Sequence, residues 1–191
     1  MTEVLHYIIW MRFELIALAV LLLLLLIKIF SDKLNTSVVL GLVYVALIGM
    51  LISIFPNARG SMFGNMFITD QTISFEKAIL VFATLLIFLQ ANNWLKKTEQ
   101  CVEFCLLIFS VLMGMFFMLS SGNFLMFYLG LEMATIPLAA LAAFDFDRIR
   151  SAEGAGKMIL SSAFSSAILL FGLSILYGTT GTLDFGEMKF L

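Results

Sequence analysis

Residues 123–144 read NFLMFYLGLEMATIPLAALAAF, and residues 154–177 read GAGKMILSSAFSSAILLFGLSILY. Both segments are long and apolar, and each holds one ionisable residue, Glu132 in the first and Lys157 in the second. A charged side chain at the centre of a membrane costs at least about 2.5 kcal/mol, so such residues are rare and mark functional sites. The two segments therefore predict a membrane protein with a polar site, for which the rest of the chain is the scaffold.

The composition indicates an integral membrane protein of the helical type. Of the 191 residues, 62% are hydrophobic and 13% are charged, whereas a soluble domain carries roughly 25% charged residues. The apolar residues occur in long runs and do not alternate with polar ones, which excludes a membrane β-barrel. The net charge of −2 is too small to indicate a nucleic-acid partner. We therefore predict an all-α, polytopic bundle of transmembrane helices in contact with the lipid bilayer.

Six apolar segments are long enough to cross the membrane as helices, which takes about 20 residues each. Residues 56–70 are predicted to form a glycine-containing loop. Glu76 and Lys77 lie one turn inside the third segment, where long side chains can extend back to the membrane interface. The polar to amphipathic tail after Tyr177 is not expected to span. The single membrane domain is predicted to contain spans at about 13–30, 36–55, 72–91, 101–119, 123–143 and 154–177.

Basic residues are distributed unevenly between the links that join these spans. Six lie in or beside the links after the first, third and fifth spans, and three lie on the opposite side. Because basic residues are retained on the cytoplasmic side, this distribution predicts that both termini lie outside the cytoplasm. The six are Lys28, Lys33, Lys96, Lys97, Arg148 and Arg150, and the three are Arg12, Arg59 and Lys189.

The two cysteines, Cys101 and Cys105, lie one helical turn apart on an apolar segment. They could in principle ligate a metal ion, but no histidine or further cysteine lies near them in the sequence. We therefore predict that they are small packing residues and that the chain has no metal site. The sequence also lacks a glycine-rich dinucleotide-binding motif and an iron–sulfur ligation pattern, so no cofactor is expected in this chain.

The sixth predicted span carries a polar stripe. Glu153, Lys157, Ser161 and Ser165 recur every four residues, which places them on one face of a helix. Glu153 could pair with Lys157 one turn away. Serines that let helices approach closely would explain the two hydroxyls, but not a lysine. A hydrated polar path is the favoured interpretation of the stripe, and simple packing with a lysine that extends to the interface is the alternative.

Glu132 lies about nine residues into the fifth span, near mid-membrane, on a face shared with Tyr128 and Thr135. Pro137 removes a backbone donor and frees the carbonyl of Met133 one turn earlier. Burial favours the protonated carboxyl of Glu132, and a nearby lysine would favour the carboxylate. These opposing effects predict a reversible proton site. The alternative is a permanently neutral glutamate with a structural hydrogen bond.

The predicted depths of the ionisable residues argue against direct contact between Glu132 and Lys157. The expected helix ends place the two residues roughly 10 Å apart in height, which excludes a simple salt bridge between them. Glu103, near the start of the fourth span, is a candidate third station on the same proton path. An ordinary interfacial charge is the alternative interpretation of Glu103.

Three short motifs connect these segments with a known family. They are Gly130-Leu131-Glu132 with Pro137, then Ser151-Ala152-Glu153 with Lys157, and then Tyr177-Gly178 with Gly181. The sequence MFITD at 66–70, followed by a span with Phe75 and Lys77, adds a fourth point of likeness. This combination closely resembles the subunit N family of the proton-pumping NADH:quinone oxidoreductase (respiratory complex I), which belongs to the antiporter-like superfamily.

The resemblance implies roles for individual residues. Glu132 matches the key glutamate of the family's fifth helix, which is thought to modulate pumping, and Lys157 matches a lysine of the sixth helix. Glu153 and Glu103 match accessory acidic positions. Members of the family normally continue with a broken seventh helix that carries a central lysine, whereas this sequence stops at Leu191. The resemblance therefore implies the N-terminal portion of such a subunit, and proton translocation by this portion alone is not expected.

The resemblance also implies a function and a location. The chain is expected to contribute to proton translocation coupled to electron transfer from NADH to quinone, in the bacterial inner (plasma) membrane. Other membrane subunits are the expected partners, and NADH, FMN, iron–sulfur clusters and quinone are expected on other subunits. A subunit of a multisubunit cation/proton antiporter is one alternative. A structural membrane subunit that moves no protons is another.

Overall fold

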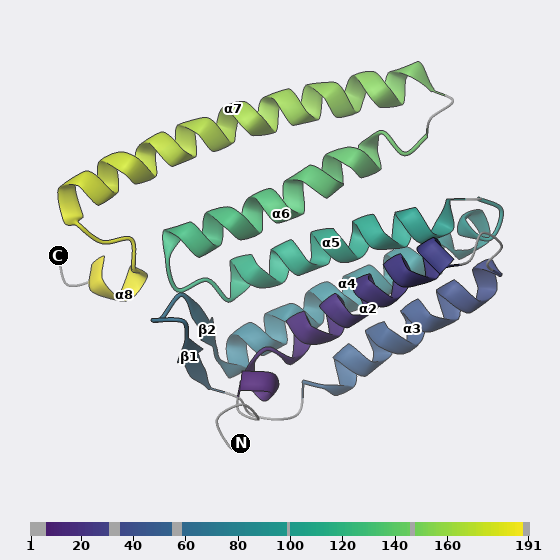
Figure 1. Ribbon diagram of the computed structural model, residues 1–191, viewed down its shortest axis with the longest axis horizontal. Helices are drawn as coiled ribbons and strands as arrows, with labels where there is room; N and C mark the ends of the chain where they lie inside the picture. Colours follow the sequence, from purple (N-terminus) through teal and green to yellow (C-terminus); the bar gives the residue numbers. More distant parts are fainter. Residues whose placement is uncertain (1–6, 31–34, 55–58, 99, 146–147, 189–191) are drawn as a thin grey trace.

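The computed structural model describes residues 7–30, 35–54, 59–98, 100–145 and 148–188. Within these ranges the chain is a bundle of long helices that run alternately up and down, with a small hairpin at one end (Figure 1). The predicted all-α membrane bundle is confirmed. The elements are α2 (Arg12–Phe30), α3 (Thr36–Ile52), β1 (Gly60–Met62), β2 (Phe67–Thr69), α4 (Gln71–Leu95), α5 (Cys101–Leu119), α6 (Phe124–Ala142), α7 (Ile149–Thr180) and α8 (Phe185–Met188).

The helices begin and end where local chemistry favours it. Asn35, Asp70 and Asn123 precede α3, α4 and α6, and the side chain of each accepts a hydrogen bond from a backbone N–H at the start of its helix. Gly181 ends α7 with a left-handed φ of 72°, and its N–H donates to the carbonyl of Tyr177. α6 contains Pro137 and continues past it as one unbroken α-helix.

Three helices match the predicted spans closely, and three differ by several residues at an end. α5 has the predicted ends, α2 begins one residue early, and α6 is one residue shorter at each end. α3 ends three residues before its predicted end, and α4 ends four residues after its own. α7 begins at Ile149, five residues before the predicted start, because its charged first turn is helical. In the part of the chain that the structure describes, five helices are long and apolar enough to cross a membrane, and α3 is a shorter apolar helix of 17 residues.

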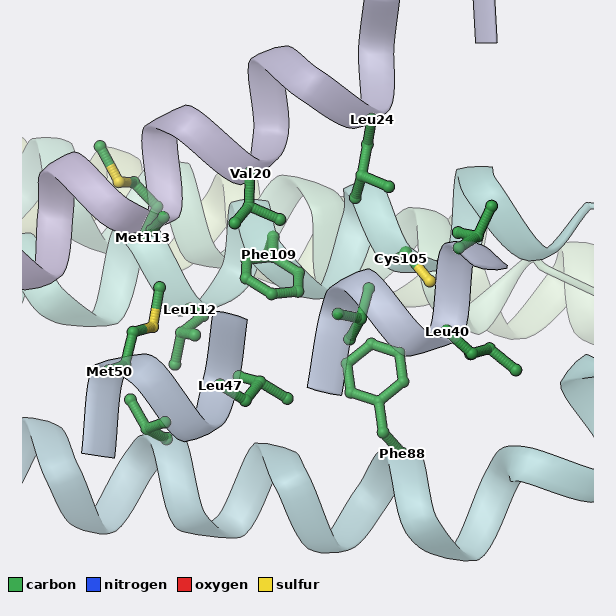
Figure 2. Packing of buried hydrophobic residues seen from close by; sticks show 14 of the residues in the cluster. Val20, Leu24, Leu40, Leu47, Met50, Phe88, Cys105, Phe109, Leu112 and Met113 are labelled. Atoms are coloured by element: carbon green, nitrogen blue, oxygen red, sulfur yellow. The ribbon is translucent and has the colours of Figure 1, made fainter. Parts of the chain in front are cut away.

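The core lies among α2, α3, α4 and α5. Figure 2 shows Phe88 of α4, Phe109 and Leu112 of α5, and Leu47 and Met50 of α3 packed together. Cys101 and Cys105 belong to the same buried cluster, as expected of packing residues. Many leucines and isoleucines on the outer faces of the helices are exposed, which suits a lipid environment.

α5 is the central helix, and α6 and α7 form successive layers outside the core. α6 packs on α5 and lies between α5 and α7, and α7 packs mainly on α6 (Figure 1). Most residues of α7 are exposed, and of its described residues only Ala155 and Ser166 are buried. α7 therefore presents a long, largely uncovered surface.

The contact between α5 and α6 brings the two backbones together. A Cβ atom at Gly114 would lie 2.5 Å from the backbone nitrogen of Ala134, and one at Gly130 would lie 2.7 Å from that of Met118. Small residues at such positions let membrane helices approach closely. Glu132 is two residues from both Gly130 and Ala134, so it lies on the side of α6 that faces away from α5.

The predicted loop at 56–70 is in part a β-hairpin, in which Gly60 pairs with Thr69 and Met62 with Phe67. Positive φ angles at Phe63, Gly64 and Asn65 form its turn. Residues 55–58 lie outside the described part of the chain. Strands of three residues are too short to show an alternating pattern in the sequence, which is why the hairpin was not predicted.

Main-chain hydrogen bonds join the hairpin to the link between α5 and α6, and join that link in turn to the segment after α7. The N–H of Gly122, in the link between α5 and α6, donates to the carbonyl of Met66 at 2.7 Å. A Cβ atom on Gly122 would overlap the carbonyl oxygen of Asn65. The N–H of Phe124 in turn donates to Leu183, just after α7. The hairpin end is therefore held together by backbone pairing.

Side chains join the helices at the opposite end, which we call the loop end. The rings of Trp94 on α4, Phe104 on α5 and Phe144 after α6 meet edge to face with centroids 5.3–6.0 Å apart. The Ser151 hydroxyl also donates to the carbonyl of Ala142 at 2.6 Å. Side-chain contacts thus hold the loop end together, whereas backbone hydrogen bonds hold the hairpin end together.

The close approach of α5 and α6 predicts that Gly130→Ala destabilises the protein. The added methyl has no room against Met118, and overpacking typically costs about 1–3 kcal/mol. Gly49→Ala is the matched control, because nothing lies within 4 Å of its Cβ position and Ala favours a helix by up to about 1 kcal/mol. We expect a lower thermal unfolding temperature of the detergent-extracted protein for Gly130→Ala only. Equal temperatures for both variants would contradict this packing argument.

Candidate functional site

Glu132 lies in the middle of α6 and is partly buried. Its Oε1 atom is buried, with no hydrogen-bond partner among the described residues. The Tyr128 side chain, one turn earlier, interacts with the Glu132 carboxyl, and the Thr135 hydroxyl donates to the Glu132 carbonyl at 3.4 Å. A buried carboxylate oxygen without a partner is unfavourable, whereas a protonated or hydrated carboxyl is tolerated. Glu132 is thus a partly buried polar group whose hydrogen bonding is incomplete within the described residues.

The stripe on α7 forms as the spacing predicted, but on an open surface. Lys157 Nζ lies 2.5 Å from Glu153 Oε1, and the two side chains are 74% and 59% exposed. Ser161 and Ser165 are also exposed, and the Ser165 hydroxyl donates to the Ser161 carbonyl at 2.9 Å. Ser166, which follows Ser165 in the chain, is buried instead. The polar stripe therefore lies beside the face that packs on α6 and is not covered by it.

The depth of Lys157 follows from the observed start of α7. Lys157 is eight residues after Ile149, which is about 12 Å along the helix. α7 has 32 residues and is about 48 Å long, longer than the roughly 30 Å hydrocarbon core. Lys157 and Glu153 therefore lie toward the loop end of α7, where water can reach them. Lys157 pairs with Glu153 and not with Glu132. Because α7 begins earlier than predicted, Lys157 is eight residues and Glu132 is ten residues from the loop-end terminus of its helix, so the observed helix ends do not support the predicted height difference of roughly 10 Å.

Glu103 also lies at the loop end, at the start of α5. Its Oε1 atom is 2.6 Å from Lys28 Nζ, at the end of α2. Its Oε2 atom is buried without a hydrogen-bond partner in the described part of the chain. Glu103 borders a largely apolar pocket of about 410 Å³ between α5 and α6, whose other lining residues are Gln100, Leu107, Ala140, Ala143 and Phe144.

The predicted site residues thus fall into separate groups. Two ion pairs, Glu153–Lys157 and Glu103–Lys28, lie at the loop end, on α7 and between α2 and α5. Glu132 lies between that end and the hairpin end, on α6. Direct hydrogen bonds do not join these groups to one another among the described residues. Any coupling between them has to act through charge or through water.

The sequence analysis missed one buried ion pair. Lys77 Nζ lies 2.5 Å from Glu14 Oε1, and both side chains are 1% exposed. The prediction that Lys77 extends to the membrane interface was wrong, because Phe67 of the hairpin and Phe116 of α5 cover it. Glu76, the neighbouring residue, is exposed. The available signal was the opposite charges of Glu14 and Lys77 near the starts of two spans that enter from the same side.

Comparisons with known proteins show which proteins this chain is similar to. Residues 121–191 match the family model described as NADH:quinone oxidoreductase/Mrp antiporter, TM. NADH-quinone oxidoreductase subunit N from Phocaeicola vulgatus is 46% identical over 144 residues, which cover 74% of this chain and 30% of the relative. Subunit N from Thioalkalivibrio sulfidiphilus is 35% identical over 182 residues, which cover 92% of this chain and 38% of the relative. This chain is similar to subunit N.

A solved structure supports the same fold. A chain of respiratory complex I from Thermus thermophilus with bound Aureothin superposes with a TM-score of 0.68 at 24% identity, covering 91% of this chain and 38% of that chain. The chain therefore spans about a third of the length of the subunit N relatives that it matches. The predicted resemblance to the subunit N family is confirmed. The family match includes Glu132, Glu153, Lys157, Ser161 and Ser165, whereas Glu103 precedes it.

The two types of ion pair predict very different effects on stability. Lys28→Ala removes the cation of an exposed pair, which is worth at most about 1 kcal/mol. Lys77→Ala leaves the Glu14 carboxylate buried without its partner, which costs about 3–5 kcal/mol. We expect Lys77→Ala to lower the unfolding temperature and the amount of protein in the membrane, and Lys28→Ala to change neither. A well-folded Lys77→Ala protein would show that the pair is not buried.

Proposed function

We propose that this chain is part of a membrane subunit of a proton-translocating NADH:quinone oxidoreductase and contributes to proton translocation coupled to electron transfer from NADH to quinone. The observation that carries the proposal is Glu132, a partly buried carboxyl in the middle of an apolar helix, with one buried oxygen unpaired among the described side chains. The names of the subunit N relatives support the same function. Redox chemistry, with NADH, FMN, iron–sulfur clusters and quinone, is assigned to other subunits.

Each polar group has a distinct task in this proposal. Glu132 holds a proton at mid-membrane. The Glu153–Lys157 pair, at the loop end, provides charges that change the proton affinity of Glu132 when the pair opens or closes. Glu103 borders a pocket at the same end and connects the bundle with water. Ser161 and Ser165 continue the polar surface from Lys157 toward the middle of α7.

The open stripe on α7 supports an assembly with other membrane subunits. Charged side chains that face lipid at depth are unfavourable, so Lys157 and Glu153 require polar neighbours or water. Other membrane subunits, or further helices of the same protein, supply this cover in our proposal. The assembled complex is placed in the bacterial inner (plasma) membrane. The excess of basic residues at the loop end supports an orientation with that end in the cytoplasm and the hairpin end outside.

The description of the matched family also names an Mrp antiporter, and a subunit of a cation/proton antiporter is the second candidate function. Such a subunit would use the same glutamate and lysine to exchange a cation for a proton. The subunit N relatives favour the oxidoreductase. A structural subunit that moves no protons would not need an ionisable group at Glu132.

Replacement of Glu132 tests the proposed function. Gln keeps the shape and hydrogen-bonding capacity of Glu132 but carries no negative charge and exchanges no proton. We expect Glu132→Gln to assemble normally and to lose a substantial share of proton pumping, while Glu132→Asp retains more. Proton uptake and NADH oxidation are measured in membrane vesicles that contain the whole complex and are normalised to subunit content.

Glu76→Gln is the matched control for this measurement, because Glu76 is an exposed carboxylate near the start of α4. The control is expected to pump as the wild type does. Wild-type pumping by Glu132→Gln would return Glu132 to a structural role and remove the main support for the proposal.

The proposed orientation is tested by cysteine labelling. Arg59→Cys at the hairpin end and Lys97→Cys at the loop end both introduce thiols at exposed positions, whereas Cys101 and Cys105 are buried. We expect a membrane-impermeant maleimide to label Arg59→Cys in intact cells and Lys97→Cys only in inverted vesicles. Labelling of both from the same side would contradict the alternating arrangement of the spans.

A further inference from the structure

The pocket between α5 and α6 lies at the loop end of the bundle, beside the Lys28–Glu103 ion pair. We propose that it binds a phospholipid with a primary ammonium headgroup, such as phosphatidylethanolamine, whose acyl chain enters the pocket and whose headgroup meets the ion pair at its mouth. The inference goes beyond the proposed function and does not depend on it, because it concerns lipid binding and not proton transfer.

The lining of the pocket changes from polar to apolar along α5. Gln100 precedes the helix and Glu103 lies in its first turn, whereas Leu107 lies one turn deeper. A phospholipid in a membrane has the same order, with its headgroup at the surface and its acyl chains toward the bilayer centre. The wall on the α6 side consists only of apolar side chains, those of Ala140, Ala143 and Phe144.

The pocket is an open recess of a suitable size. Its volume is about 410 Å³, within the range of roughly 300–1,000 Å³ that is typical of sites for small ligands. Gln100 and Ala140 are exposed, so a ligand can enter from the surroundings of the bundle. The small side chains of Ala140 and Ala143 leave room for a hydrocarbon chain between the two helices.

Glu103 supplies acceptors for an ammonium group. A carboxylate has about four acceptor positions, and the donor that the described side chains provide is Lys28, whose Nζ lies 2.6 Å from Oε1. The Oε2 atom has no hydrogen-bond partner in the described part of the chain. Because the terminal torsion of a glutamate is soft, a rotation of the carboxylate can turn that oxygen toward the pocket. A primary ammonium donates three hydrogen bonds, whereas the quaternary ammonium of phosphatidylcholine donates none.

Lys28 supplies the opposite charge for the phosphate. Its side chain is 51% exposed and that of Glu103 is 37% exposed, so a headgroup can reach both members of the pair. In phosphatidylethanolamine a phosphate and an ammonium group are likewise neighbours. The headgroup therefore complements the pair, with its ammonium on Glu103 and its phosphate on Lys28, and both contacts are charge-assisted.

The charges of the links beside the pocket favour a zwitterionic ligand over an anionic one. Residues 96–103 and 145–150 together hold four basic and four acidic side chains. Clusters of basic residues attract anionic lipids, whereas charges of both signs in equal number do not. Phosphatidylglycerol also lacks the ammonium group that Glu103 would accept. The expected ligand is therefore zwitterionic.

Photolabelling of the whole complex tests the proposal. Phosphatidylcholine vesicles that contain the complex receive a trace of phosphatidylethanolamine, phosphatidylcholine or phosphatidylglycerol, each with the same diazirine-bearing acyl chain. Labelled residues are located by mass spectrometry, and labelling of Leu107, Ala140 and Phe144 is normalised to that of the exposed residues of α4. We expect the phosphatidylethanolamine probe to label the pocket several-fold more than either of the other probes does.

Two variants separate the acyl-chain contact from the headgroup contact. Ala140→Leu places a larger side chain in the pocket, and its control Ala83→Leu makes the same change at an exposed position of α4. Glu103→Gln removes the negative charge at the mouth, and its control Glu76→Gln removes an exposed carboxylate near the start of α4. We expect Ala140→Leu to lower pocket labelling by all three probes. Glu103→Gln is expected to lower labelling by the phosphatidylethanolamine probe to the level of the phosphatidylcholine probe, and both controls to label as the wild type does.

The other outcomes overturn the inference. Equal labelling of the pocket by the three probes indicates ordinary lipid contact, stronger labelling by phosphatidylglycerol indicates an anionic-lipid site, and no labelling indicates that another part of the complex covers the pocket. These comparisons use the wild-type complex, so they remain decisive when a variant does not assemble. A phosphatidylethanolamine preference that persists in assembled Glu103→Gln complex overturns the headgroup contact. None of these measurements depends on proton pumping, so a failure of the proposed function in the Glu132→Gln experiment is a separate result.

Discussion

The backbone contact between α5 and α6 is the interaction on which the arrangement of the polar residues depends. α6 is attached to the core through α5, and α7 is attached mainly through α6. Gly114 and Gly130 make that attachment possible because neither has a side chain to hold the helices apart. The same contact turns Glu132 away from the core. The close packing at Gly114 and Gly130 thus determines which side of α6 carries the Glu132 carboxyl.

Charge compensation follows a different rule at each level of the bundle. At the loop end the cations and carboxylates meet in exposed pairs, such as Lys28–Glu103, where water supports both partners. At the hairpin end the Glu14–Lys77 pair is buried, and aromatic rings replace water around the ammonium. Glu132 lies between these levels without a cation at salt-bridge distance among the described residues. Of the carboxyls compared here, Glu132 is thus the one whose charge no neighbouring cation balances within the described residues.

The sequence predicted the features that are decided within one segment. The ends of α5 followed from an apolar run between polar links, and the Glu153–Lys157 contact followed from a four-residue spacing. The early start of α7 was missed because charged residues in a first helical turn resemble a surface loop. Those residues are compatible with a helix that extends past the apolar region.

Features decided between segments were not predictable in the same way. Whether Lys77 turns outward or inward depends on which helices lie beside α4, and hydropathy carries no such information. The hairpin depends on hydrogen bonds to the link between α5 and α6, more than 50 residues after β1, as in the bond from Ile68 to the Ser120 carbonyl. The site on α6 and α7 could thus be named from the sequence, whereas its surroundings could not.

The contrast between the two ends of the bundle has a mechanical consequence. Backbone hydrogen bonds join the hairpin to the link before α6, and they join that link and the start of α6 to the segment after α7, as in the bond from Phe124 to Leu183. At the other end α7 is held by side chains, such as the Ser151 hydroxyl on Ala142. α7 is about 48 Å long, and Lys157 lies toward the end that side chains hold. A change in the tilt of α7 about the hairpin end would therefore displace Lys157 several times more than Gly181.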